Sequence, residues 1–396
     1  MKTITSTVPI VRFKEFTESW KKRKIGDFLT TSRISGHTGL AAKKLTVKLW
    51  GKGIVEKSDA YQGSENTQYY IRHTGQFIYG KLDFLHAAFG IVPEKYDGYE
   101  STIDSPAFDI RGMNEKFLLN RVGQTNFYLR YGNMANGSRK AMRIHEETFL
   151  DMPIVVPSLK EQSLIGCYIT CIDKLITLYQ SKMEQQKKLK KYFLQNMFPA
   201  KGEKVPKIRL KGFYGNWELK RFSDVGTIAM CKRIFKDETS ENGEIPFFKI
   251  GTFGKEPDAY ISRRLFDEYK SKYSYPKVGD ILVSASGTIG RQVEYKGEDA
   301  YYQDSNIIWL QHDKSIDNKF LKVLYEIVKW DGIEGSTIKR LYNDNFLKTK
   351  FYLPSLDEQK KIGEYFISFD RLINYYQYKF DKLQTLKKYM LQNMFV

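Results

Sequence analysis

The sequence contains few cysteines and no long run of apolar residues. Its three cysteines, Cys167, Cys171 and Cys231, make no disulfide framework and suit a reducing compartment. No apolar stretch approaches the roughly 18 residues that a membrane-spanning helix needs, and the first residues lack the apolar core of a secretory signal. These absences predict a cytoplasmic protein with no membrane partner.

Catalytic and metal-binding patterns are also missing. The histidines are scattered without an H-E-x-x-H or C-x-x-C partner, at His37, His73, His86, His145 and His312. No residue belongs to a recognisable nucleophile constellation, and the Asn/Asp-Pro-Pro-aromatic tetrapeptide with which adenine methyltransferases hold an extruded base is absent. We therefore expect no catalytic residue, no metal site and no cofactor in this chain.

Two glycine-containing stretches fall short of phosphate-binding loops. Residues 75–82 read GQFIYGKL, but Leu82 stands where such a loop needs a hydroxyl for magnesium, and the glycines lie in a strand pattern. Residues 284–291, SASGTIGR, lack the G-x-G-x-x-G spacing of a dinucleotide site. We interpret the second stretch as a tight turn whose hydroxyls and Arg291 are suited to DNA phosphates.

Positive charge is abundant instead. The 396 residues contain 64 Lys and Arg against 46 Asp and Glu, a net charge of +18. Residues 1–156, 157–200, 201–353 and 354–396 each contain more basic than acidic residues, so the charge is not confined to one tail. A positive field over the whole chain favours the phosphate backbone of nucleic acid as a partner.

The chain contains one stretch twice. Residues 157–198 align without a gap on residues 354–395, so that Pro157 matches Pro354 and Phe198 matches Phe395. Each copy begins with a proline and a serine, and a glutamate three residues after the serine completes the pattern of a capping box. Each copy therefore predicts a helix of about 38 residues, roughly 57 Å long at 1.5 Å per residue.

Mostly apolar residues recur in both copies at alternating steps of three and four, which predicts a coiled-coil seam. The apolar seam positions are Ile165, Tyr168, Ile172, Leu175, Tyr179, Leu189 and Phe193 in the first copy. In the second copy they are Ile362, Tyr365, Phe369, Leu372, Tyr376, Leu383, Leu386 and Met390. An amphipathic helix packed only on its own domain is the alternative, but two matched seams of this length favour pairing with each other.

The duplication extends upstream of the helices. The two lead-ins share the pattern R-x-K-x-F-x-x-x-W, at residues 12–20 and 209–217. We expect two α/β (α+β) globular domains, residues 1–156 and 201–353, each followed by a long helix, residues 157–200 and 354–396. The pattern within the domains predicts strands at 77–84, 100–103, 280–284 and 306–310 and short helices at 114–122 and 317–330.

Basic and hydroxyl side chains gather in the loops between these elements, and such side chains grip phosphates and read base edges. In the first half the candidates are Lys43, Lys44, Lys48, Lys52, Arg139, Lys140 and Arg143. In the second half they are Lys232, Arg233, Lys236, Ser286, Thr288, Arg291, Lys339 and Arg340. Each alone is more simply a solvated surface residue, but together they indicate recognition of DNA.

This combination resembles the DNA-specificity subunit of a type I restriction-modification system. The resemblance rests on the two P-S-L-x-E-Q-x-x-I-G openings at residues 157–166 and 354–363, the two lead-ins and the repeated L-Q-N-M-F helix ends. The run GDILVSASGTIGR at residues 279–291 is also typical of target-recognition domains in that family. The likeness extends over essentially the whole chain.

The resemblance implies two target-recognition domains, each reading one half of a split double-stranded DNA site. It implies that the two helices pair antiparallel as a spacer and dock two modification subunits, which hold S-adenosylmethionine and methylate adenine. Restriction subunits that use ATP and magnesium would join the larger assembly. Two other functions stay open: a coiled-coil scaffold without specific DNA binding, and a self-contained restriction enzyme or methyltransferase.

Overall fold

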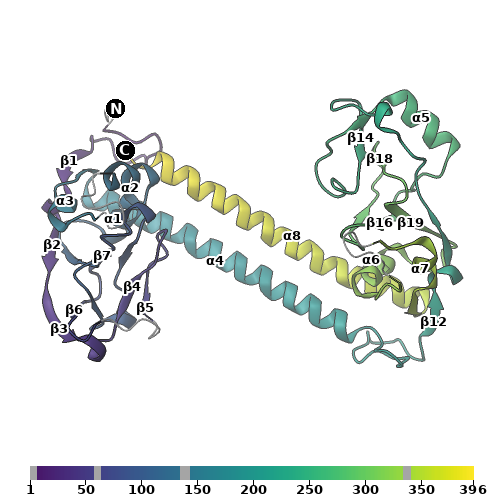
Figure 1. Ribbon diagram of the computed structural model, residues 1–396, viewed down its shortest axis with the longest axis horizontal. Helices are drawn as coiled ribbons and strands as arrows, with labels where there is room; N and C mark the ends of the chain where they lie inside the picture. Colours follow the sequence, from purple (N-terminus) through teal and green to yellow (C-terminus); the bar gives the residue numbers. More distant parts are fainter. Residues whose placement is uncertain (1–6, 58–63, 134–142, 333–339) are drawn as a thin grey trace. The chain divides into compact units, whose positions relative to one another are not determined.

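The structure, a computed structural model, describes residues 7–57, 64–133, 143–332 and 340–396. It divides into two compact units, the first made of Met1–Gln180 and Tyr378–Val396 and the second of Ser181–Gln377. Both long helices, α4 (Leu159–Asn196) and α8 (Leu356–Asn393), contribute to both units (Figure 1). Each unit therefore combines one globular domain and the start of its own helix with the end of the other helix.

The first unit contains four small antiparallel sheets. Their orders are β1-β11, β2-β10-β7-β8, β3-β6-β9 and β4-β5. The strands are β1 (Lys21–Lys24), β2 (Leu29–Ser32), β3 (Ile34–Thr38), β4 (Leu45–Val47), β5 (Ile54–Glu56), β6 (Gln68–Ile71), β7 (Phe77–Tyr79), β8 (Phe89–Ile91), β9 (Glu100–Ser101), β10 (Ala107–Ile110) and β11 (Pro153–Val156). The short helices are α1 (Glu115–Val122), α2 (Thr125–Gly132) and α3 (Glu146–Leu150), with 3-10 turns η1 (Ile25–Asp27), η2 (Gly39–Ala41), η3 (Phe84–His86) and η4 (Glu94–Tyr96).

The second unit repeats part of this plan. Its sheets have the orders β12-β20, β13-β19-β16-β17 and β15-β14-β18, and only the β14-β18 pair is parallel among the described strands. The strands are β12 (Glu218–Arg221), β13 (Gly226–Ala229), β14 (Ile245–Phe248), β15 (Tyr260–Ile261), β16 (Ile281–Ser284), β17 (Gln292–Glu294), β18 (Tyr301–Tyr302), β19 (Ile307–His312) and β20 (Lys350–Leu353). The short helices are α5 (Arg263–Lys272), α6 (Asn318–Ile327) and α7 (Asn343–Lys348), with 3-10 turns η5 (Phe222–Asp224) and η6 (Lys236–Glu238).

The four-stranded sheets of the two units have the same strand order. The pair β1-β11 of the first unit corresponds to the pair β12-β20 of the second. One aromatic residue that the repeat shares lies at the centre of each core. The ring of Phe149 lies 4.6 Å from Tyr79 and 5.6 Å from Phe77, and the ring of Phe346 lies 4.9 Å from Phe222. The duplicated pattern predicted from the sequence is therefore a duplicated α+β fold.

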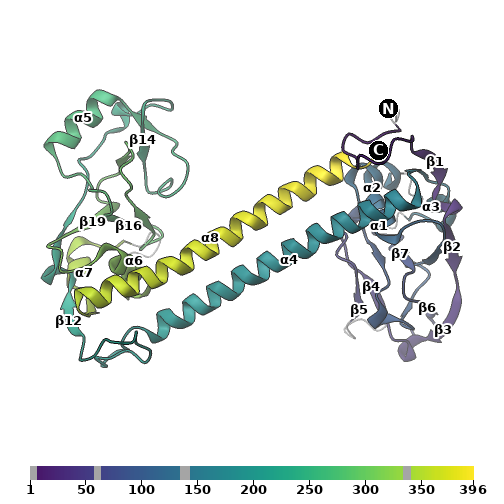
Figure 2. The same cartoon turned by 180° about the vertical axis from the view of Figure 1, so that it is seen from behind.

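The end of each long helix lies in the core of the unit in which the other long helix starts. The end of α8 lies in the first unit, and the end of α4 lies in the second. In the first unit Met394 and Phe395 are buried, and the Phe395 ring lies 5.3 Å from Phe117 of α1. In the second unit Met197 and Phe198 are buried, and the Phe198 ring stacks on Phe320 of α6 at 5.8 Å. In both views α1 lies beside the start of α4 and α6 beside the start of α8 (Figures 1 and 2). The repeated M-F pairs are thus anchors that bury a helix end by the hydrophobic effect.

Within the second unit the two helices run antiparallel. The Lys182 ammonium lies over the Tyr376 ring, Lys190 pairs with Asp370 at 2.7 Å, and the Phe193 ring lies 5.3 Å from Tyr365. The first unit contains the equivalent ion pair, Lys387–Asp173, at 2.5 Å. The antiparallel pairing of the helices is therefore confirmed, with the same polar contact used twice.

The seam is less buried than the heptad pattern predicts. Of the predicted positions, Ile165, Ile172, Ile362 and Phe369 are buried. Half-buried positions are Tyr168, Tyr179, Phe193, Tyr365, Tyr376, Leu383, Leu386 and Met390. Leu175, Leu189 and Leu372 are exposed, at 40–42% of their surface. A pair of helices buries only the side chains between them, so positions at the edge of the seam stay open to solvent.

Several predicted elements differ in length. The strand expected at residues 100–103 is β9, which ends at Ser101, and the strand expected at residues 306–310 is β19, which extends to His312. The strand expected at residues 77–84 ends at Tyr79, because the backbone turns at Gly80, whose carbonyl accepts a hydrogen bond from the Asp83 amide at 3.2 Å. The helix expected at residues 317–330 is α6, which ends at Ile327 because Val328 is extended, with φ −64° and ψ 136°. Asn114 and Asp317 cap α1 and α6 through their side-chain oxygens, so the predicted starts of both helices are confirmed.

Candidate nucleic-acid interface

Each globular domain is fixed to the start of its long helix by what we call the helix-start latch: Arg12, Trp20, Glu161 and Gln162 in the first unit, and Arg209, Trp217, Glu358 and Gln359 in the second. The Arg12 guanidinium donates to the Glu161 carboxylate at 2.7 and 2.9 Å, and Trp20 Nε1 donates to it at 3.4 Å. Arg209 donates to Glu358 twice, at 2.8 Å each. The hydrogen bond to Glu161 raises the pKa of Arg12, so the guanidinium stays charged.

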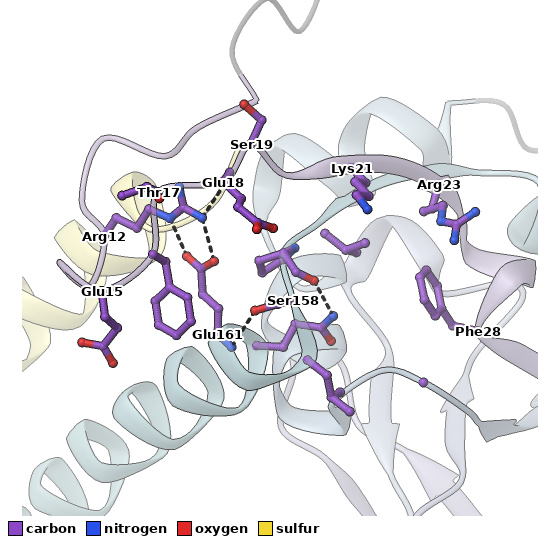
Figure 3. A pocket seen from close by; sticks show the side chains of 16 residues that line it. Arg12, Glu15, Thr17, Glu18, Ser19, Lys21, Arg23, Phe28, Ser158 and Glu161 are labelled. Atoms are coloured by element: carbon purple, nitrogen blue, oxygen red, sulfur yellow. Dashed lines mark hydrogen bonds and ion pairs between the residues drawn. The ribbon is translucent and has the colours of Figure 1, made fainter.

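Arg12, Glu161 and Gln162 of the first latch line a hollow of about 460 Å³. Figure 3 shows Arg12 pointing to Glu161, with Ser158 beside the helix start. The Glu161 amide donates to Ser158 Oγ at 3.4 Å, which is half of the predicted capping box. The other half is wrong, because the Glu161 carboxylate faces Arg12 instead of turning back to the backbone of Ser158. A charge-assisted bidentate pair is stronger than the capping bond that it replaces.

The glutamine and glycine of the repeated opening complete the latch. Gln162 accepts from the Asn114 amide at 3.0 Å, and Gln359 accepts from the Asp317 amide at 2.9 Å, so each glutamine holds the start of α1 or α6. A Cβ on Gly166 would lie 2.7 Å from Asn114 Oδ1, and one on Gly363 would lie 2.6 Å from the Lys319 Cβ. The repeated E-Q-x-x-I-G opening is thus the docking surface for the short helix of each domain.

The basic residues predicted in the first domain have different surroundings. Lys43, Lys48 and Lys52 are exposed, the last two on the β4–β5 hairpin. Lys44 is buried with its ammonium 5.3 Å from the Tyr69 ring, so it supports the fold rather than facing a ligand. Arg143 pairs with Asp104 at 3.2 Å. Arg139 and Lys140 lie outside the described residues.

In the second domain the structure brings two of the predicted residues together. The backbones of Ser286 and Arg340 form an isolated β-bridge, and Ser286 Oγ donates to Asn306 at 2.8 Å. Ser286 is buried, whereas Arg340 is exposed beside a hollow of about 410 Å³. Arg340 is therefore the member of this pair that faces solvent and can meet a phosphate.

The remaining candidates of the second domain lie apart from that pair. Thr288 is exposed at the turn after β16, and Arg291 donates to the Phe253 carbonyl at 3.1 Å. Lys232, Arg233 and Lys236 are exposed after β13. Lys339 lies outside the described residues. The turn at residues 284–291 is thus a tight loop, held by the hydrogen bond from the Arg291 amide to Ser284 Oγ at 2.9 Å.

Sequence reasoning missed the exposed aromatic residues next to these cations. Trp50 is 56% exposed between Lys48 and Lys52, and Phe235 is 55% exposed between Arg233 and Lys236. Stacking of bases on aromatic rings and pairing of phosphates with cations are the two main contacts of nucleic-acid-binding surfaces. An aromatic residue with a basic residue on either side is the signal that would have found both.

The lysine of the GQFIYGKL stretch has a structural role. Lys81 is buried, and its ammonium donates to the Glu146 carboxylate at 2.9 Å. Burial alone would raise the pKa of Glu146, but hydrogen bonds from Lys81 and Arg33 lower it. Because this lysine is already paired with a carboxylate, it is not arranged to hold a phosphate.

Within the described residues, no group of three or more His, Cys, Asp or Glu side chains is arranged to hold a metal ion. No helix among them is long and apolar enough to cross a membrane.

The fold defines a class of protein, one with two α+β domains of the same plan, each latched to the start of a long helix. The model of the type I restriction modification DNA specificity domain matches residues 214–384. A putative type I restriction enzyme specificity subunit of Haemophilus influenzae is 58% identical over 152 residues, which are 38% of this chain and 40% of that protein. The MjaVIII specificity subunit of Methanocaldococcus jannaschii is 27% identical over 265 residues, 62% of this chain and 61% of that protein. The chain thus spans less than two thirds of the length of either relative.

Solved structures share the fold over nearly the whole chain. The S subunit of a type I restriction-modification system from M. genitalium has a TM-score of 0.62 at 13% identity, covering 98% of this chain and 99% of that one. A chain from a structure of an assembled type I system has a TM-score of 0.50 at 15% identity, covering 96% and 98%. The chain is similar to the specificity subunits of type I restriction-modification systems, and the resemblance seen in its repeated motifs is confirmed.

Proposed function

We propose that this chain is the sequence-specific DNA-binding subunit of a type I restriction-modification complex. Each globular domain reads one half of a bipartite double-stranded site, and the paired helices set the gap between the halves. The observation that carries the proposal is the duplication itself. The latch and the four-stranded sheet occur twice, while the loops that carry the candidate contacts differ between the units. Such a chain is suited to a DNA target whose two halves have different sequences.

The paired helices also support docking of two identical modification subunits. Apolar side chains are exposed on both helices at positions that the repeat relates, namely Leu175 with Leu372, Leu178 with Tyr375, and Tyr192 with Tyr389. Exposed apolar positions that occur in matched sets mark a surface for a partner. Because each position occurs once in each copy, the helices offer the same surface twice.

In this proposal the chain itself is not catalytic. The modification subunits hold S-adenosylmethionine and methylate adenine, and restriction subunits use ATP and magnesium. The role of this chain is to select the DNA site, with Lys43, Lys48, Lys52 and Lys232 among the side chains suited to phosphates. A scaffold without specific DNA binding would give no salt-dependent affinity for duplex DNA, and the comparisons do not favour it.

The test is methylome sequencing of a methylation-free host that expresses this chain with its cognate modification subunit. We expect a new split motif, with methylated adenine in both halves, that is absent when this chain is left out. A matched variant in which a relative's residues replace residues 20–150 should change one half of the motif only. An assembled complex that produces no new methylation would overturn the proposal.

A further inference from the structure

One exposed aromatic residue of the first unit lies beside a groove. Trp50 follows strand β4 at the tip of the β4–β5 hairpin (Figure 1). It forms part of the wall of a groove of about 850 Å³ within this unit, which is otherwise lined by the loop between α1 and α2 and by segments of α4 and α8. More than half of its surface is open to solvent, which is uncommon for the largest side chain of a folded domain.

The hairpin holds this ring in a strained and fixed position. Trp50 has φ +61°, in the left-handed region that bulky residues rarely adopt. Its amide donates to the His86 carbonyl at 2.7 Å, and the next amide, of Gly51, donates to the Ala87 carbonyl at 2.9 Å. The indole contacts the His86 ring edge to face at 5.4 Å. Backbone strain at an exposed residue is typical of functional sites.

The turn does not require an exposed ring. The second domain contains a similar aromatic-Gly-Lys turn at residues 253–255, with Gly254 at φ +74°, and there the Phe253 ring is completely buried. The exposure of Trp50 is therefore particular to the first domain. A buried ring would stabilise the fold, whereas an exposed ring serves a ligand.

The charges and polar groups around the groove define that ligand. Lys48 and Lys52 flank Trp50 on the hairpin, and the exposed Lys388 of α8 lines the groove, where the neighbouring Lys387 is already held in an ion pair. The acidic residue of the lining, Asp173, is neutralised by Lys387 at 2.5 Å. The remaining polar lining is mostly carboxamides. Those of Asn120, Gln124 and Asn126 are hydrogen-bonded within the unit, whereas Gln384 and Gln392 are exposed on α8. Lysines suit phosphates, and carboxamides suit base edges.

We propose that the Trp50 hairpin and this groove bind DNA, with the indole stacking on a base of the half-site that the first domain reads. This inference rests on the proposed function and deepens it by assigning a base contact to a residue. Aromatic and apolar side chains inserted at a base step unstack it, so the contact would also favour half-sites that deform easily there. Phe235, between Arg233 and Lys236, is an exposed ring at a different position of the second domain.

The chain offers a variant that separates binding from folding. Replacing Trp50 with glycine removes the ring and also relieves the left-handed strain, because glycine adopts positive φ freely. The variant should therefore fold with an unchanged or higher melting temperature. Trp50→Phe keeps an aromatic face, and Tyr214→Ala removes another strongly exposed ring that lies in the lead-in of the second domain, so these two serve as controls.

The experiment uses the full chain assembled with its modification subunits and a random-sequence duplex DNA library as the probe. Wild-type complex should select two half-sites. The Trp50→Gly complex should lose sequence preference in the half read by the first domain and bind the wild-type consensus about 10-fold more weakly, within the range that stacking on one base contributes. Trp50→Phe should retain most of the preference, and Tyr214→Ala should behave as wild type.

Fluorescence gives an independent readout. Trp20, Trp217 and Trp309 are buried and Trp330 is half-buried, so Trp50 is the exposed tryptophan among the five. Adding the selected duplex should quench the wild-type emission, and the quenching should be lost in Trp50→Gly. Unchanged half-sites and affinity in Trp50→Gly would refute the base contact, and failure of that variant to assemble with modification subunits would make Trp50 a protein contact instead. If wild-type complex selects no sequence, the proposed function itself fails.

Discussion

Removing the arginine of one helix-start latch should destabilise that unit strongly. The Glu161 carboxylate has 1% of its side chain exposed and is bound by Arg12 on both oxygens. Arg12→Met keeps the aliphatic volume but leaves a buried carboxylate without its cation. Breaking a buried pair in this way costs about 3–5 kcal/mol, because the remaining charge is not compensated. For a unit of this size the loss corresponds to a melting temperature lower by about 6–20 °C.

The cost should fall when the second partner is neutralised as well. In the double variant Arg12→Met/Glu161→Gln no charge stays buried, and the Trp20 indole still has an oxygen acceptor nearby. We therefore expect the double variant to be more stable than Arg12→Met alone, which is the coupling that a double-mutant cycle measures. Additive losses would refute the reasoning, since they would mean that Arg12 and Glu161 do not act as a pair.

The assay must distinguish the two units. Hydrogen exchange of backbone amides does so, because β1 pairs with β11 in the first unit and β12 pairs with β20 in the second. Arg12→Met should speed exchange in the first pair only. Arg209→Met, which leaves Glu358 equally buried, should speed exchange in the second pair only. Equal loosening of both sheets by either variant would contradict the assignment of one latch to one unit.

Three further changes test other parts of the structure. Gly166→Ala should lower the free energy of unfolding by about 1–3 kcal/mol, because its Cβ would lie 2.7 Å from Asn114 Oδ1. Gly251→Ala is the control, because a Cβ there meets open space and should be neutral. Thermal melting of both variants tests this. Glu146→Gln should destabilise the first unit at neutral pH, and the difference from wild type should shrink as the pH falls below about 4, because a carboxyl with a lowered pKa stabilises the fold only while it is ionised; denaturation at several pH values gives the sign. Seven residues inserted after both Gln180 and Gln377, where the chain passes from one unit to the other, should lengthen the methylated motif's gap by up to about three base pairs, since a heptad adds about 10.5 Å. A gap of unchanged length in methylome sequencing would refute the spacer role.

The sequence was sufficient for the features that depend on local patterns. A sustained heptad pattern and a serine-glutamate start predicted helices at residues 157–200 and 354–396, and α4 and α8 lie within those bounds. Asn114 and Asp317 marked the starts of α1 and α6 because a capping side chain acts within three residues. The repeat placed matching parts in both halves without any knowledge of their contacts.

The features that depend on distant residues could not be predicted in this way. Glu161 has the right spacing for a capping box, but Arg12, which is 149 residues away, binds its carboxylate. Lys44 and Lys48 look alike in the sequence, yet one is buried against Tyr69 and the other is exposed. Trp50 was missed because tryptophan is ordinarily a core residue, and only the backbone of the hairpin shows that its ring faces outward.

The distribution of these differences bears on how the chain would perform the proposed function, the selection of an asymmetric target together with two identical modification subunits. The main contacts that fix the helices recur in both units: the arginine–glutamate pairs of the latches and the equivalent ion pairs Lys190–Asp370 and Lys387–Asp173. One contact differs, because Trp20 Nε1 donates to Glu161 whereas the buried Trp217 Nε1 has no hydrogen-bond partner among the described residues. Contacts at the surface differ: helix α5 occurs in the second unit and has no counterpart among the described residues of the first. Since the repeated part would face the modification subunits and the variable part the DNA, changes in the loops can alter one half-site while the docking surface stays intact. The specificity of each half can then diverge without loss of assembly, which is the property that a modular reader of bipartite sites requires.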